Sequence, residues 1–138
     1  MALLEVENLH VSFQTYGGEV HAVRGVNLSL EKGETLAIVG ELGSGKSVTA
    51  QSIMRLIPTP PGIMKEGEIR FDGKDLLSLP EKEMFRLRGS EISMIFQDPM
   101  TSLNPVFTIG DQIVEAIRQH RKLDKKAARR LAASLRQV

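Results

Sequence analysis

The stretch from Gly40 to Ser47, with the sequence GELGSGKS, constrains the fold of this chain more than any other feature. It fits the pattern G-x-x-x-x-G-K-[ST], in which glycines let successive backbone N–H groups turn inward and surround an anion. A helix that starts at the end of such a loop points its positive end at the same anion. The segment therefore predicts a phosphate-binding loop (P-loop), with Lys46 reaching the β- and γ-phosphates and the Ser47 hydroxyl ligating Mg²⁺.

The residues on either side of the loop provide the context that the motif requires. Residues 34–39 form a short apolar run, which predicts a buried strand of a parallel sheet. After the loop, apolar residues recur at helical spacing until Pro58 interrupts the pattern. A strand, a glycine loop and a helix in this order favour a phosphate site over a glycine turn with a solvated lysine.

The composition is that of an ordinary soluble domain. Of the 138 residues, 41% are hydrophobic and 25% are charged, and the formal net charge of +1 provides no overall field that would attract nucleic acid or an anionic membrane. The absence of cysteine excludes disulfides and thiolate metal sites. Because no apolar run is long enough to span a membrane and the first residues do not form a secretory signal, we expect a cytosolic location.

Apolar and polar residues alternate in the first third of the chain, which predicts a small antiparallel sheet. The expected strands are centred on residues 4–13, 20–23 and 26–30, with a turn at Gly17-Gly18. The sheet would lead directly into the buried parallel strand at residues 34–39.

Strands and helices are also expected after the P-loop helix. Residues 67–71 predict a strand, and residues 91–97 predict another, buried on both faces because its apolar run is nearly continuous. A helix is expected from about Pro80 to Gly89, and helical periodicity resumes at Asp111. Asp124 is the expected cap of a last helix.

Gln97 stands at the end of the second apolar run, immediately before the turn-forming pair Asp98-Pro99. A glutamine at this position can ligate a metal ion or position a water molecule. A lone glutamine at a strand end is more often structural, but its place downstream of a P-loop favours a functional role.

Taken together, the P-loop, the strand ending in Gln97 and the antiparallel N-terminal sheet resemble the ATP-binding subunits of ABC transporters, in that family's order. Residues 87–105 (LRGSEISMIFQDPMTSLNP) and 106–113 (VFTIGDQI) resemble the branch that serves dipeptide, oligopeptide and nickel importers. The resemblance covers essentially the whole chain. It implies an α/β P-loop NTPase fold of the ABC ATPase type.

The resemblance divides the chain into three parts of one ATPase domain. Residues 1–33 would form an antiparallel β subdomain, residues 34–97 an incomplete parallel-sheet core with the P-loop, and residues 98–138 the family's Q-loop and the start of a helical subdomain.

The resemblance also assigns roles to individual residues. Adenine would stack on Tyr16 or, as second choice, on Phe13, while Ser47 and Gln97 would bind Mg²⁺. Gln97 would also sense the γ-phosphate, and Lys46 and Gln97 form the expected catalytic set. The phosphates would be held by Gly40, Gly43, Ser44, Gly45, Lys46, Ser47 and Val48.

The function implied is an ATPase that energises the import of peptides or nickel from the cytoplasmic face of the membrane. Its expected partners are the permease subunits, contacted through residues 98–110, a second ATPase subunit and, indirectly, a solute-binding protein, with no nucleic acid. Two alternatives stay open: a soluble ABC-type ATPase acting on nucleic acid or in assembly, and a P-loop kinase. Residues 87–113 favour the transporter, and the long antiparallel sheet argues against the kinase.

Three family motifs have no match in the sequence: the LSGGQ-like signature, the acidic strand that supplies a metal carboxylate and the general base, and the switch histidine. We therefore interpret the chain as an N-terminal part of the ATPase domain. It would bind nucleotide weakly at most, without turnover. An uncovered apolar strand edge would make it marginally stable or self-associating.

The last part of the chain is rich in lysine and arginine. The simplest interpretation is a solvated helix face, and the alternative is a surface for nucleic acid or anionic lipid. No aromatic residue lies between Gln112 and Val138, which weakens the case for single-stranded nucleic acid. His10, His21 and His120 share no spacing typical of a metal site.

Overall fold

The computed structural model describes residues 1–135, with only the backbone at residue 99. The chain divides into two compact units, Met1–Met84 and Phe85–Val138. The first unit contains a sheet and two helices, α1 (Lys46–Ile53) and most of α2 (Glu81–Leu87). The second contains a short 3-10 turn, η1 (Pro99–Thr101), and two longer helices, α3 (Ile109–His120) and α4 (Lys125–Leu135).

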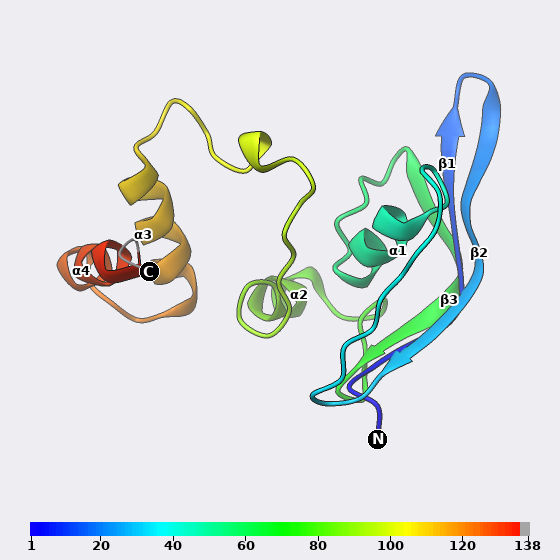
Figure 1. The fold of residues 1–138 in the computed structure, drawn as a ribbon, viewed down its shortest axis with the longest axis horizontal. Helices are drawn as coiled ribbons and strands as arrows, with labels where there is room; N and C mark the ends of the chain where they lie inside the picture. The colour runs from blue at the N-terminus through cyan, green and yellow to red at the C-terminus, as the bar shows by residue number, and fades with distance from the viewer. Residues whose placement is uncertain (136–138) are drawn as a thin grey trace. The chain divides into compact units, whose positions relative to one another are not determined.

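The sheet of the first unit has four antiparallel strands in the order β2-β1-β3-β4 (Figure 1). They are β1 (Leu4–Thr15), β2 (Gly18–Leu30), β3 (Gly62–Phe71) and β4 (Lys74–Asp75). One face carries the core, in which Val6, Leu9 and Ile69 are almost completely buried. Helix α1 lies beside this sheet and contacts β2.

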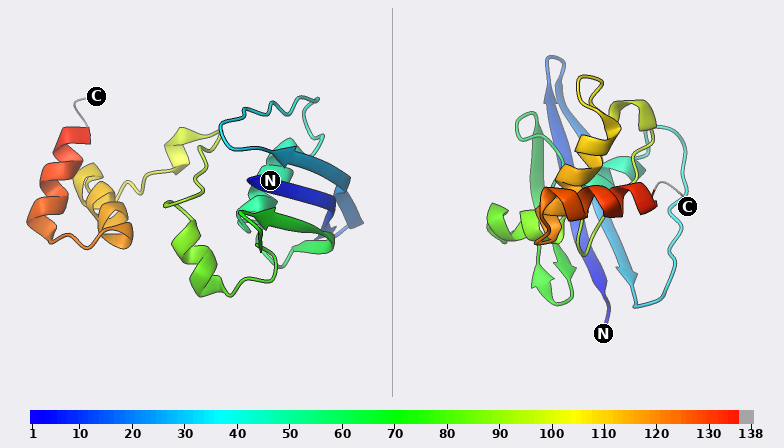
Figure 2. Two further views of the ribbon diagram at one scale, coloured as in Figure 1. Left: turned by 90° about the horizontal axis from the view of Figure 1, so that it is seen from below. Right: turned by 90° about the vertical axis from the view of Figure 1, so that its left-hand side faces the viewer.

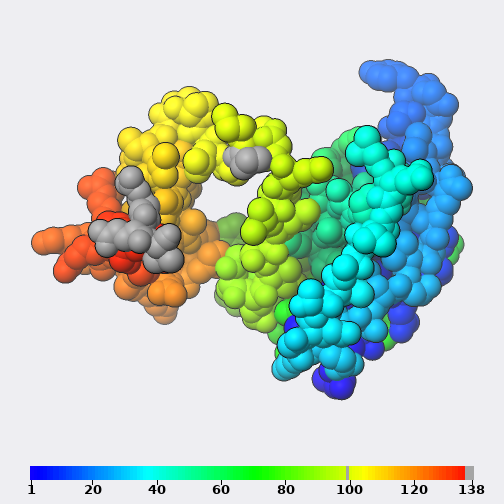
Figure 3. All heavy atoms as spheres, in the orientation of Figure 1, coloured from blue at the N-terminus to red at the C-terminus, as the bar shows by residue number. Residues whose placement is uncertain are grey.

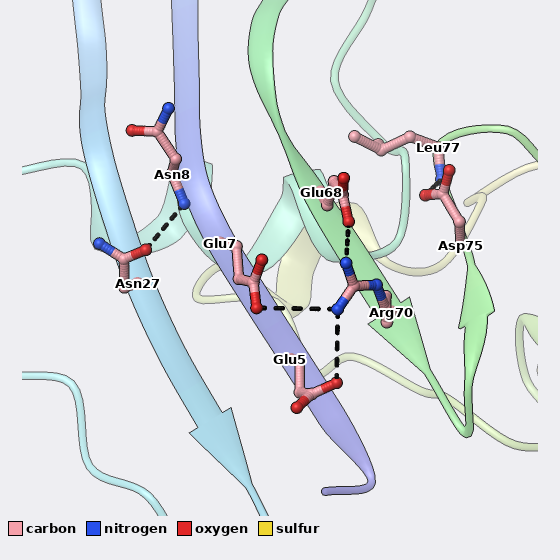
Figure 4. Close-up of polar contacts among 8 residues, drawn as sticks. All are labelled: Glu5, Glu7, Asn8, Asn27, Glu68, Arg70, Asp75 and Leu77. Carbon is pink, nitrogen blue, oxygen red and sulfur yellow. Dashed lines mark hydrogen bonds and ion pairs between the residues drawn. The ribbon is translucent and has the colours of Figure 1, made fainter.

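The opposite face of the sheet is polar, as strand alternation requires. Arg70 on β3 interacts there with three carboxylates, those of Glu5, Glu7 and Glu68 (Figure 4). The hydrogen bond with Glu68 is the main cause that raises the pKa of Arg70, and the charges of Glu68, Glu7 and Glu5 add to it. All these groups are at least one third exposed, so we interpret them as a solvated stabilising network.

The expected antiparallel sheet is confirmed, with one change in its strands. The strands expected at residues 20–23 and 26–30 are the single strand β2, which pairs with β1 along its length. Gly25 takes a positive φ of 69° within β2, and the pairing register shifts nearby, between Val6 and Leu9 and again at His10. This irregularity bends the strand without ending it, which explains why the alternation is interrupted there.

Two other expected strands are wrong. Residues 34–39 have no regular secondary structure, and their apolar side chains are exposed, with Val39 at 90% (Figure 3, cyan). Residues 91–97 make only an isolated bridge from Ile92 to Arg88, and Ile95 is 98% exposed. A strand requires a hydrogen-bonded neighbour, and among residues 1–135 no strand pairs with either segment.

The second unit is organised by α3 and α4, which pack side by side (Figure 2). Val114 of α3 is buried against Ala128 and Ala132 of α4, whose small side chains allow a close approach. Asp124 caps α4 as expected, since its carboxylate accepts the N–H of Ala127 at 2.6 Å. Over the part of the chain that the structure describes, no helix is both long and apolar enough to cross a membrane.

Candidate functional site: a phosphate-binding loop

The loop from Gly40 to Gly45 leads directly into helix α1. Gly43 and Gly45 take positive φ angles of 81° and 90°, the left-handed region in which side-chain-bearing residues are strained. Gly45 is the N-cap of the helix, and its carbonyl accepts the first helical N–H, that of Thr49, at 2.9 Å. The loop is therefore curled at the helix start rather than extended.

Helix α1 begins without any side chain that closes its N-terminus. No side chain caps it and no acidic residue lies in its first turn. The first N–H groups of a helix have no partner within the helix, and here they include the amides of Lys46, Ser47 and Val48. This end of α1 thus combines unpaired donors with the positive end of the helix dipole, which suits an anion.

Lys46 lies inside the curl of the loop. Its ammonium group donates to the carbonyl oxygens of Gly40 and Glu41, each at 2.7 Å, and to the Ser44 hydroxyl at 3.2 Å. No carboxylate forms an ion pair with it in the described part of the chain. The cation therefore stays available at the loop, and an incoming phosphate oxygen has to replace only one of three neutral acceptors.

Close packing explains why Gly45 has to be glycine. A Cβ on Gly45 would lie less than 3.0 Å from the Ala22 carbonyl oxygen of β2, far inside van der Waals contact. A Cβ on Gly43 would meet nothing within 4 Å. The loop is thus fixed against the sheet at Gly45, whereas Gly43 serves only the turn. The sequence motif contains both glycines but does not distinguish these roles.

The two aromatic candidates for adenine stacking lie in different surroundings. Tyr16 is at the tip of the β1–β2 hairpin and its side chain is fully exposed. Phe13 is partly buried, and its ring is within 3.4 Å of the position that a Cβ on Gly62 would take. Tyr16 is thus the more accessible of the two side chains, and its role in stacking stays a prediction.

Gln97 belongs to the second unit, whereas the phosphate-binding loop belongs to the first. Its side chain is exposed, at a bend that follows the irregular residues 93–96. The next turn is closed by Asp98, whose carboxylate accepts the N–H of Met100 at 2.9 Å. The roles assigned to Gln97 from the resemblance stay predictions.

Gln112 holds the turn that follows, a role that the sequence does not indicate. Its Oε1 accepts the N–H of Asn104 at 2.8 Å, and its Nε2 donates to the carbonyls of Asn104 at 2.8 Å and Phe107 at 3.0 Å. The Asn104-Pro105 pair predicts a turn, but nothing marks a glutamine eight residues later as its support. The turn leaves Val106 and Phe107 on the surface, 82% and 61% exposed.

A second polar cluster, around His21, does not form a catalytic triad. The Ser12 hydroxyl lies 2.9 Å from Nδ1 of His21, and the Glu19 carboxylate lies 3.9 Å from the same nitrogen. In a catalytic triad the carboxylate and the nucleophile contact opposite nitrogens of the histidine ring. The carboxylate is instead paired with Lys65, whose hydrogen bond is the main cause that lowers the pKa of Glu19.

Comparison with known proteins defines the class of this chain. The family profile described as ABC transporter matches residues 23–138, and the chain therefore belongs to that family. The fold agrees, since a dimeric ATP-binding cassette in a post-hydrolysis state bound to ADP and Pi superposes with a TM-score of 0.79 at 23% identity. That match covers 95% of this chain and 54% of the cassette. The expected fold class is confirmed.

Individual relatives of this chain include ATP-binding proteins of peptide transport. The chain is 65% identical to the oligopeptide transport ATP-binding protein OppD of Bacillus subtilis, over 96% of this chain and 37% of OppD. It is 59% identical to the dipeptide transport ATP-binding protein DppD of the same species, over 96% of this chain and 40% of DppD. It is 49% identical to the glutathione import ATP-binding protein GsiA of Pectobacterium atrosepticum, over 92% of this chain and 21% of GsiA. The chain spans about two fifths or less of the length of these relatives.

Proposed function

We propose that this chain is the ATP-binding part of an ABC transporter ATPase that energises the import of peptides or nickel. The observation that carries the proposal is the open N-terminus of α1, with Lys46 held inside the loop beside it. The identities to OppD and DppD support the peptide branch. Nickel stays an alternative cargo because the resemblance includes nickel importers.

The chain's own residues would hold the nucleotide from two sides. The amides at the start of α1, with Lys46 and Ser44, would bind the phosphates. Tyr16 would stack on adenine, a contact worth about 1–3 kcal/mol by analogy with bases on aromatic side chains. Each charged hydrogen bond from Lys46 to phosphate adds about 1.5–3 kcal/mol.

Mg²⁺ fits the donors that are assigned to it. The Ser47 hydroxyl is exposed in the first turn of α1, and Gln97 would add an amide oxygen, both hard oxygen ligands of the kind that Mg²⁺ prefers. When bound, the ion would neutralise negative charge on the phosphates. Ser47 would position it at the loop, and Gln97 would sense the γ-phosphate.

Residues 98–110 would contact the permease on the cytoplasmic face of the membrane. The contact would use the exposed apolar side chains of this segment, among them Met100, Val106 and Phe107. Further partners would be a second ATPase subunit and, indirectly, a solute-binding protein. The division into parts at residues 33 and 97 belongs to the same proposal.

On its own, the chain would bind nucleotide weakly and would not turn it over, because its sequence offers a phosphate clamp but no match to the family's water-activating acidic strand. The exposed apolar residues of segments 36–42 and 95–109 would also promote self-association.

The test is a calorimetric titration of the chain with Mg-ATP, repeated on Lys46→Ala and on the control Lys32→Ala. Lys32 is an exposed lysine outside the loop. We expect weak binding to the parent chain and to the control, and none to Lys46→Ala. Equal affinity of all three proteins would contradict the proposal, as would binding of AMP as tightly as ATP.

A further inference from the structure

Basic side chains are concentrated where α3 ends and α4 begins. Within residues 118–130 the only acidic residue is Asp124. The basic residues of this stretch, here called the elbow cluster, are Arg118, Arg121, Lys122, Lys125, Lys126, Arg129 and Arg130. All seven side chains are exposed.

The nearly neutral net charge of the chain conceals a strong separation of charge. Residues 1–84 carry 8 basic and 12 acidic residues, a net charge of −4. Residues 85–138 carry 10 basic and 5 acidic residues, a net charge of +5. The sequence-based expectation that no overall field attracts an anionic surface therefore does not apply to the second unit alone.

The elbow cluster has little compensation within the protein. Among the residues that the structure describes, Arg129 pairs with Asp111 at 3.5 Å, and the other six side chains have no ion pair. Like charges this close repel one another, at a cost that an anionic partner would remove.

The cluster surrounds a concave surface. A groove of about 890 Å³ is lined by apolar residues, including Val114 and Leu123, and by two carboxylates, Asp111 and Glu115. Five members of the elbow cluster line the same groove: Arg118, Arg121, Lys122, Lys125 and Arg129. A groove with a partly apolar floor and a cationic rim suits a phosphorylated headgroup with its glycerol.

The packing of α4 limits how it could contact such a surface. Its apolar residues Ala128 and Ala132 are buried against α3, so they cannot insert into a bilayer. Lys126 and Arg130 lie four residues apart, one turn of helix, and both face outward. Contact with a membrane would therefore be electrostatic and superficial.

We propose that the elbow cluster binds the headgroups of anionic phospholipids. This contact goes beyond the proposed docking to a permease and depends on the charge of the second unit, not on nucleotide binding. Lipid is favoured over single-stranded nucleic acid because Phe107 is the one Phe, Tyr or Trp among the described residues that line the groove, and residues 112–138 add no aromatic side chain on which successive bases could stack.

The test is flotation of the chain with vesicles of phosphatidylcholine alone and with vesicles that also contain phosphatidylglycerol. The variant is Lys122→Gln/Lys125→Gln, which removes two lysines that line the groove. The control, Lys74→Gln/Lys82→Gln, removes the same charge from exposed positions of the first unit. Circular dichroism verifies that each protein keeps its helices.

We expect binding only to the phosphatidylglycerol vesicles, and its loss at high salt. A basic side chain near an anionic membrane contributes about fivefold in affinity, so the variant should bind roughly 25-fold more weakly and the control like the parent. Equal weakening by both pairs, or no binding to anionic vesicles, would overturn the proposal. So would a salt-sensitive DNA or RNA complex that depends on Lys122 and Lys125 in the absence of vesicle binding.

Discussion

Helix α3 begins at Thr108, whose hydroxyl accepts the N–H of Asp111 at 3.2 Å and donates to the Asp111 carboxylate at 2.8 Å. Helix α1 begins at Gly45, which has no side chain to offer, and no acidic residue follows in its first turn. The two helices present the same unpaired amides and the same dipole. In α3 the Thr108 hydroxyl accepts one of these amides and the Asp111 carboxylate lies in the first turn, whereas no side chain caps α1.

Under the proposed function, the open end of α1 serves to bind a ligand and has a cost in helix stability. A glycine in place of a side-chain cap costs roughly a few tenths of a kcal/mol of helix stability. This cost falls on a helix of only 8 residues. The loop compensates locally, because Lys46 bonds its carbonyls and Gly45 packs against β2.

The largest expected change in stability comes from the packing of the loop against the sheet at Gly45. Gly45→Ala should destabilise the chain by about 2–5 kcal/mol, because the new Cβ is strained at positive φ and clashes with the Ala22 carbonyl. Gly43→Ala has the same backbone strain but open space, and should cost only about 1–2 kcal/mol. Urea unfolding of both variants measures the difference, and equal costs would disprove the close packing at Gly45.

A single substitution, Ser47→Asp, gives the start of α1 an acidic side chain like that at the start of α3. Ser47→Asp places a carboxylate in the first turn, where it should stabilise the helix by about 0.3–1 kcal/mol. The same charge should repel phosphate and weaken Mg-ATP binding about tenfold or more, equivalent to about 1.4 kcal/mol. The control is Ser47→Asn, because asparagine has the shape of aspartate without its charge and also lacks the serine hydroxyl. Unchanged affinity in Ser47→Asp would mean that the open end of α1 is not the anion site.

The converse change opens the start of α3. Thr108→Ala removes the cap and should cost about 1 kcal/mol in the stability of the second unit. Hydrogen exchange of the α3 amides would report this loss, while Mg-ATP affinity should not change. A parallel loss of affinity would indicate that the two helix starts are not independent.

The smallest expected effect depends on pH. The hydrogen bond from Thr108 is the main cause that lowers the pKa of Asp111, with Arg129 adding to it. A carboxylate whose pKa is lower in the folded state contributes stability above its unfolded pKa, near pH 4, and loses it as pH falls through the folded value. Between neutral pH and pH 3, the midpoint of thermal unfolding should therefore fall slightly more for the parent chain than for Asp111→Asn. Parallel curves for the two proteins would refute it.

The sequence predicted those features that depend on local chemistry. The P-loop, the β1–β2 hairpin and the Asp124 cap each follow from residue types at fixed spacing, and all three are present. The strands expected at 34–39 and 91–97 failed because a strand depends on a neighbour, which the apolar run itself cannot reveal. The support of Gln112 for the 104–107 turn and the contact of Gly45 with β2 likewise depend on tertiary neighbours.

By the proposed function, the open start of α1 receives the phosphates of a nucleotide. Two-dimensional NMR of the isotopically labelled chain, titrated with Mg-ATP, tests it amide by amide. We expect saturable shifts for the amides of residues 43–48 and none for the amides of residues 109–111, at the capped start of α3. Shifts of equal size at both helix starts, or shifts that leave residues 43–48 unaffected, would contradict it.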